Sequence, residues 1–134
     1  DKYSASYTEF RTDLSTVQLM AYTDKISIIH VFPKPGMGGI VESDIKKLKK
    51  AWESGNQTVA VYQSVASGPG QYALVSRLKD GLKEFQMGYR KPMKERYDAA
   101  NGEGTYDMFL HHISKTSENN WSEILSYRAD LSSK

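Results

Sequence analysis

The sequence predicts a single α+β domain built on an antiparallel sheet. Three observations favour this class: four runs with strand composition, helical periodicity between them, and glycine or proline at most of their borders. The chain has 134 residues, of which 39% are hydrophobic, enough for one core. No run approaches the roughly 20 apolar residues that a membrane-spanning helix requires.

Each strand is predicted from alternation or from β-branched and aromatic composition. Residues 25–32 read Lys-Ile-Ser-Ile-Ile-His-Val-Phe, and Pro33-Lys-Pro-Gly36 ends the run because proline cannot donate to a ladder. Residues 58–65 and 71–78 alternate around Ser67-Gly-Pro-Gly70, which predicts a hairpin with a slightly long loop. The last strand is predicted over residues 123–131.

The helices are predicted from their periodicity and their end signals. Val41, Ile45, Leu48 and Trp52 form one apolar stripe over residues 40–54, and Gly55-Asn56 is a natural stop. A short helix is expected over 82–87, and a second helix starts at Pro92 and runs to about Ala100. A third helix follows from Thr105, with Tyr106, Phe109, Leu110, Ile113 and Ser117 on one face.

The predicted order is the ferredoxin-like β-α-β-β-α-β pattern, with an extra helical insertion at about 82–119 before the last strand. Such crossovers place the helices on one face of a four-stranded antiparallel sheet. Residues 25–134 are taken as this domain, and residues 1–24 as an N-terminal arm with one short strand or helical turn. Every strand carries apolar or mixed residues on both sides, so we expect a second copy of the sheet to cover the other face.

One stretch carries a family resemblance over about residues 25–132. Val31-Phe32-Pro33-Lys34-Pro35-Gly36, followed by a helix from near Val41-Glu42-Ser43 that holds Ile45 and Leu48, resembles the dimeric α+β barrel superfamily. Its best-known groups are antibiotic-biosynthesis and haem-degrading monooxygenases. The resemblance implies a homodimer packed sheet against sheet, and a small ligand between sheet and helices or inside the barrel. The N-terminal arm and the helical insertion depart from the minimal family pattern.

His30 is the predicted catalytic acid or base, because imidazole titrates near neutral pH and shares a strand side with Ile26 and Ile28. The alternative is a hydrogen-bonded histidine at a strand end. Tyr62 and Tyr72, with Ser64 and Ser76, are interpreted as lining one sheet face. That lining suits a pocket for a planar molecule or, equally, a dimer interface.

Arg77 is the predicted anchor for an anion or a substrate carboxylate, the alternative being an ion pair with an acidic neighbour. His111 and His112 are adjacent, so they project about 100° apart on a helix and are poorly placed to chelate one metal. No metal site is therefore predicted and no cofactor is expected. Haem contacted by His112 is the alternative that the resemblance implies, and a surface histidine is the simpler interpretation.

Composition excludes several classes of function. The absence of cysteine excludes disulfide scaffolds, thiolate zinc sites and cysteine nucleophiles. The net charge of +2, with the lysines of residues 46–50 on a solvated helix face, argues against nucleic-acid binding. We expect a soluble protein without membrane contact, either cytoplasmic or exported after removal of a signal.

The predicted function is the binding of a small aromatic or hydrophobic molecule by a dimeric α+β barrel, with cofactor-light monooxygenase or isomerase chemistry as its catalytic form. In that form Tyr62 and Tyr72 are pocket walls, Ser76 lies beside them, and His30 does the chemistry. The alternative is a non-catalytic dimeric binding or structural module. A catalytic site needs a cavity with a titratable group within reach, and a structural module would fill that space with side chains.

Overall fold

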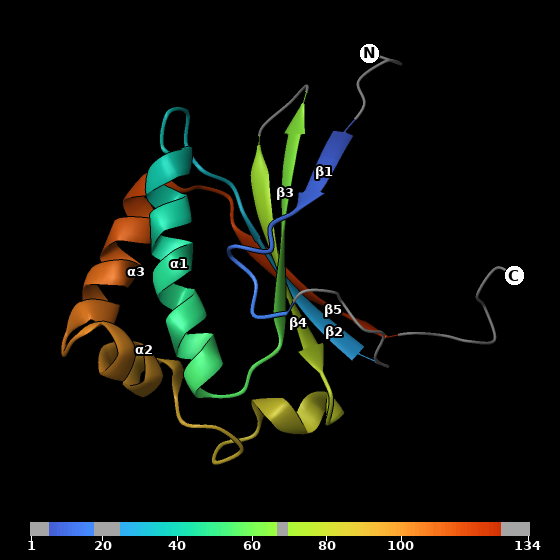
Figure 1. Ribbon diagram of the computed structural model, residues 1–134, viewed down its shortest axis with the longest axis vertical. Helices are drawn as coiled ribbons and strands as arrows, with labels where there is room; N and C mark the ends of the chain where they lie inside the picture. Colours follow the sequence, from blue (N-terminus) through green and yellow to red (C-terminus); the bar gives the residue numbers. More distant parts are fainter. Residues whose placement is uncertain (1–5, 18–24, 67–69, 127–134) are drawn as a thin grey trace, which may run out of the picture.

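A computed structural model of the protein describes residues 6–17, 25–66 and 70–126 (Figure 1). It contains five strands, three α-helices and one 3₁₀ turn. In chain order they are β1 (Ser6–Phe10), β2 (Lys25–Val31), α1 (Gly38–Ser54), β3 (Val59–Ala66), β4 (Gln71–Leu78), η1 (Gly81–Phe85), α2 (Met93–Asn101), α3 (Thr105–Thr116) and β5 (Trp121–Ser126). The predicted α+β class with an antiparallel sheet is confirmed.

The sheet has five strands where four were predicted. Its order is β1-β3-β4-β2-β5, and every neighbouring pair is antiparallel. The additional strand is β1, which lies in the segment interpreted as an arm and pairs along β3 from Ser6 opposite Ala66 to Phe10 opposite Tyr62. Five residues of mixed polarity give little periodicity, so the partner strand rather than the local sequence decides this pairing.

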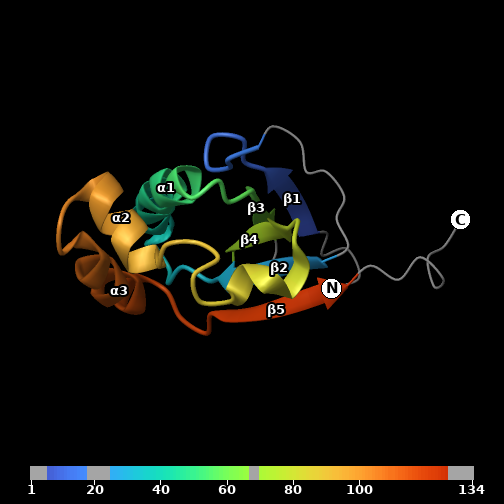
Figure 2. The ribbon, with the colours of Figure 1, turned by 90° about the horizontal axis from the view of Figure 1, so that it is seen from below.

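Two crossovers place all the helices on one face of the sheet. Both β2 and β3 are antiparallel to β4 between them, so they run parallel to each other and α1 connects them. Likewise β4 and β5 flank β2, and η1, α2 and α3 form their connection. Figures 1 and 2 show α1, α2 and α3 gathered on one side of the sheet, called here the helix-facing side.

The hydrophobic core lies between α1 and the helix-facing side. The predicted stripe of α1 supplies Val41, Ile45 and Trp52, all buried. The sheet supplies Val31, Val59, Val61, Tyr72 and Leu74. Leu14, in the segment after β1, has no exposed surface and completes this cluster. The segment interpreted as an arm therefore contributes to the core as well as to the sheet.

No described helix covers the opposite side of the sheet, called here the open side (Figure 2). Its alternating residues include Ile26, Ile28 and His30 on β2, which stand opposite Arg77, Val75 and Ala73 on β4. At its edge on β5, Trp121 and Leu125 are about half exposed.

The predicted helix and strand positions agree with the structure, apart from details at the ends. The short helix expected over 82–87 is the 3₁₀ turn η1. The last strand begins at Trp121, just after Asn119 takes a left-handed conformation with φ 57°. Its predicted part from 127 to 131 lies outside the described residues. Within the described ranges, no helix combines the length and apolar character needed to cross a membrane.

Candidate functional site

A cleft of about 620 Å³ opens between the helix-facing side of the sheet and the segment that leads from η1 into α2. Its volume suits a small organic ligand. Ser27 and Ile29 on β2 and Ser76 and Leu78 on β4 form the sheet wall. The opposite wall includes Phe85, Met87, Arg90, Met93 and Arg96, with Gln57 from the turn after α1.

The cleft exists because the helices stop short of this end of the sheet. Ile29 on the helix-facing side remains 44% exposed, although it stands opposite the buried Leu74. On the edge strand β5, Ile124 on the same side is 50% exposed. The sheet therefore leaves apolar surface accessible beside a polar wall. Ligand pockets usually combine these two kinds of lining.

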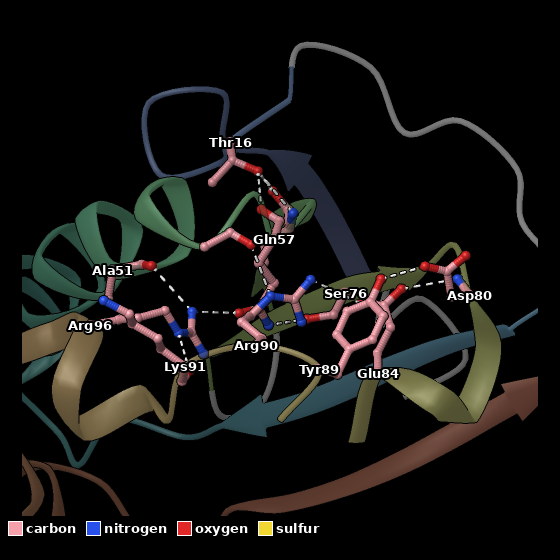
Figure 3. A network of polar contacts seen from close by, with 12 residues as sticks. Thr16, Ala51, Gln57, Ser76, Asp80, Glu84, Tyr89, Arg90, Lys91 and Arg96 are labelled. Atoms are coloured by element: carbon pink, nitrogen blue, oxygen red, sulfur yellow. Dashed lines mark hydrogen bonds and ion pairs between the residues drawn. The ribbon is translucent and has the colours of Figure 1, made fainter. Parts of the chain in front are cut away.

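Arg96 supplies the polar wall and is only 9% exposed. Its Nε donates to the Lys91 carbonyl at 2.8 Å, and its Nη1 donates to the Ala51 carbonyl at 3.2 Å and to Gln57 Oε1 at 3.0 Å (Figure 3). Its Nη2 has no partner among the described residues and is not sealed from solvent.

The charge of Arg96 is uncompensated by any carboxylate of the described residues. All three of its acceptors are neutral oxygens, two of them backbone carbonyls and one an amide. Burial lowers its pKa, and the neighbouring Arg90 lowers it further by repulsion. Guanidinium nevertheless stays protonated in proteins, so the cleft contains a buried cation that lacks a counter-charge.

Gly55 allows this arrangement at the end of α1. A Cβ at this position would lie 2.8 Å from Arg96 Cδ and 3.1 Å from Arg90 Cδ. Arg90 Nε donates to the Gly55 carbonyl at 2.9 Å, next to the Ala51 carbonyl that Arg96 binds. Both arginines therefore meet the carbonyl end of α1, where the helix dipole favours positive charge.

Arg90 differs from Arg96 because it has an acidic partner. Its Nη2 lies 3.2 Å from Glu84 Oε1, and the Glu84 side chain is only 5% exposed. Glu84 Oε2 also accepts a hydrogen bond from the Asp80 amide at 3.1 Å, and Tyr89 donates its hydroxyl to Asp80. The Arg90–Glu84 pair is thus a satisfied structural unit in the lining of the cleft, and Figure 3 shows its two side chains together.

The four residues predicted to share one sheet face are divided between two. Tyr62 stands opposite Ala73, and Tyr72 stands opposite Gln63. Side chains alternate along a strand, so a register offset of one residue puts the two tyrosines on opposite sides. Tyr72 and Ser76 face the helices, whereas Tyr62 and Ser64 lie on the open side, which corrects the single lining proposed from the sequence.

Of these residues, Ser76 lines the cleft and Tyr72 does not. Tyr72 is buried and donates its hydroxyl to Glu42 Oε2 at 2.8 Å. Burial and this carboxylate raise the pKa of Tyr72 to about 12. Tyr62 packs against Phe10 with ring centroids 5.3 Å apart. Both tyrosines therefore make structural contacts within the fold.

His30 lies on the open side, on the opposite face of the sheet from the cleft. Its Nε2 is 2.7 Å from Glu123 Oε2, and its Nδ1 is 3.0 Å from Gln71 Oε1. The Trp121 ring stacks on the imidazole at 4.1 Å. These contacts agree with the alternative of a hydrogen-bonded histidine. The catalytic role of His30 stays a prediction.

Arg77 and His112 are also outside the cleft. Arg77 is on the open side, and none of the described residues accepts a hydrogen bond from its buried Nε. His112 Nδ1 lies 2.8 Å from Asp44 Oδ2, on the far side of α1, so this histidine already has a partner. The described residues contain no group of three or more potential metal ligands.

Sequence reasoning missed Arg96, Arg90 and Gln57. The available signal was an arginine beside the buried Tyr97 inside a predicted helix, but nothing local shows that this helix reaches the end of α1.

Comparisons with known protein families, with curated proteins and with solved structures found no match. The fold and the cleft define an α+β protein with a cationic pocket between sheet and helices.

Proposed function

We propose that the protein binds a small organic anion, with a carboxylate head and an apolar body, in the cleft beside Arg96. The observation that carries the proposal is an arginine that is only 9% exposed, whose guanidinium has neutral acceptors and one nitrogen without a partner among the described residues. A carboxylate at Arg96 Nη2 would supply the missing counter-charge.

The remaining lining supports a ligand of two parts. Gln57 and Ser76 lie near the cationic end, and Ile29, Leu78 and Met93 offer an apolar wall. A charge-assisted hydrogen bond contributes about 1.5–3 kcal/mol, or roughly ten- to a hundredfold in affinity. The apolar wall adds the burial of hydrocarbon or aromatic surface.

The cleft favours binding over acid–base catalysis. Of the described residues that line it, none is a histidine, and the single carboxylate, Glu84, is held by Arg90 and the Asp80 amide. His30 lies on the other face of the sheet. We therefore favour the non-catalytic binding module over the monooxygenase or isomerase reading.

Isothermal titration calorimetry with benzoate and octanoate tests the proposal, with benzyl alcohol and octanol as neutral counterparts. We expect Arg96→Met to weaken carboxylate binding at least about tenfold, because the charge-assisted bond is lost. Ser27→Phe should abolish binding by filling the sheet wall without altering any hydrogen bond of Arg96. The control Lys94→Gln removes a positive charge from the same helix outside the cleft and should change affinity by less than about twofold.

Two results would contradict the proposal. One is equal affinity for a carboxylate and its alcohol, which would deny a role for the charge. The other is unchanged binding in Ser27→Phe, which would place the ligand elsewhere. Ser27→Phe leaves Arg96 intact, so it can still test the proposal if Arg96→Met does not fold.

The finer fold assignment is a second proposal. Without β1, the strand order β3-β4-β2-β5 and the two crossovers agree with a ferredoxin-like arrangement, with β1 as an added edge strand. We propose that two copies pack through their open sides, where the partly exposed Ile26 and Ile28 supply apolar surface. Native mass spectrometry at micromolar concentration should give a dimer, and a monomer would refute the packing.

A further inference from the structure

A second hollow, of about 290 Å³, lies at the end of β4 where the chain enters η1. Its lining includes Thr58, Arg77, Lys79, Glu84 and Arg90. Glu84 and Arg90 also line the cleft, so their ion pair stands between the two spaces. The hollow is about half the size of the cleft and mostly polar in its lining.

Arg77 is the unusual group of this hollow. The other described arginines, Arg11, Arg90 and Arg96, are each fixed by several hydrogen bonds to protein acceptors. The Arg77 side chain has none among the described residues, and its Nε is buried. A buried donor without an acceptor is costly, and a bound ion or water is one recognised explanation for such a group.

The neighbours of Arg77 present further donors to the same space. Lys79 follows two residues later, in the turn after β4, and lines the same hollow. Thr58 lies across from Arg77, whose backbone amide donates to the Thr58 carbonyl at 2.9 Å. Neither the Lys79 ammonium nor the Thr58 hydroxyl has a hydrogen-bond partner among the described residues.

The charge balance of the hollow favours an anion. Its lining carries the positive Arg77, Lys79 and Arg90 against the negative Glu84. Glu84 is already engaged by Arg90 and by the Asp80 amide, so it does not neutralise the other two. Two cations therefore remain uncompensated around a space suited to a compact ligand.

We propose that this hollow binds a small tetrahedral oxyanion: inorganic phosphate or the terminal phosphate of a phosphomonoester. Arg77 supplies a planar fork of donors, Lys79 a point charge and Thr58 a hydroxyl, a set that matches a doubly charged anion with several acceptor oxygens. A monocarboxylate offers only one charge and two oxygens to the same donors. The site is separate from the Arg96 cleft, so either proposal can fail alone.

Calorimetric titration with inorganic phosphate and with glycerol phosphate, at pH 7.5 and constant ionic strength, tests this site. We expect saturable binding of phosphate below about 1 mM, weakened at least about tenfold in Arg77→Gln and several-fold in Lys79→Gln. The matched control is Lys83→Gln, which removes a positive charge from η1 outside the hollow and should change the affinity by less than about twofold. Tighter binding of glycerol phosphate than of phosphate would identify the ester as the ligand, and the reverse would identify the free ion.

Stability measurements separate binding from folding. Because the Arg77 side chain makes no hydrogen bond to a described residue, Arg77→Gln should unfold at the same urea concentration as the wild type when phosphate is absent. Added phosphate should raise the urea midpoint of unfolding of the wild type and leave that of Arg77→Gln unchanged. Absence of binding up to about 10 mM phosphate, or equal affinity in Arg77→Gln, would overturn the proposal.

Discussion

Arg11 joins the N-terminal strand to the first helix, and its replacement should reveal how strongly that segment is held. Its guanidinium binds both oxygens of Glu42 at 2.7 and 2.8 Å and both oxygens of Asp13 at 2.7 and 2.9 Å. It also donates to Gln63 at 2.7 Å, and Tyr72 donates to Glu42 at 2.8 Å. Arg11→Met keeps the aliphatic stem, removes every bond that the guanidinium makes and leaves the Tyr72–Glu42 bond in place.

The magnitude depends on how exposed each partner is. The Glu42 side chain is 24% exposed and Asp13 is 50% exposed, so the Glu42 contact should dominate. A charge-assisted bond to a partly buried group contributes about 1.5–3 kcal/mol, and an exposed ion pair contributes at most about 1 kcal/mol. We therefore expect Arg11→Met to lower the free energy of unfolding by about 3 kcal/mol at pH 7.

The loss should depend on pH in a definite direction. Arg11 lowers the pKa of Glu42 below its ordinary value of 4.5, and it lowers the pKa of Asp13 as well. A carboxylate with a depressed native pKa stabilises the fold above the unfolded pKa and loses this effect as the pH falls through the native one. The difference between wild type and Arg11→Met should be complete at pH 7 and should shrink below about pH 4.5.

Urea unfolding followed by the fluorescence of Trp52 and Trp121 measures both effects. With a slope of about 2 kcal/mol per molar urea, 3 kcal/mol corresponds to a midpoint shift of about 1.5 M. Asp13→Asn, which touches only the exposed ion pair, is the matched control and should cost less than about 1 kcal/mol. A loss below about 0.5 kcal/mol in Arg11→Met, or a loss that stays constant down to pH 3, would refute the reasoning.

Two further substitutions address the core and the cleft. Leu14→Ala should lower the free energy of unfolding by about 3 kcal/mol in the same urea assay, because truncation of this fully buried side chain leaves a cavity. A loss below about 1 kcal/mol would show that Leu14 does not contribute to the core. Gly55→Ala should weaken carboxylate binding while Ser54→Ala does not, since only a Cβ at Gly55 would come within 2.8 Å of Arg96 Cδ. Calorimetry on both variants checks this, and equal affinities would show that Arg96 adjusts freely.

Much of the fold could be predicted because it depends on local periodicity. The stripe of α1 and the alternation of β3 and β4 follow from residue spacing, and Pro33 and Gly55 mark borders that backbone chemistry imposes. The strand β1 lacked such a pattern. Its place at the edge of the sheet depends on pairing with β3, which is distant in sequence.

The candidate site could not be predicted in the same way. Whether Tyr62 and Tyr72 share a face depends on a hairpin register offset of one residue, and alternation within each strand does not fix that offset. Arg96 is a candidate ligand-binding residue only because α2 packs against the end of α1, a contact between segments distant in sequence.

The sequence by itself determined the α+β class, the order of the predicted strands and helices and the apolar stripe of α1. These depend on intrinsic conformational preferences and on repeats of two or 3.6 residues. Only the tertiary structure decided the fifth strand, the face of each tyrosine and the partners of each arginine. Those features depend on contacts between residues far apart in the chain, such as Arg96 with Ala51 and Arg11 with Glu42, for which local sequence carries no signal.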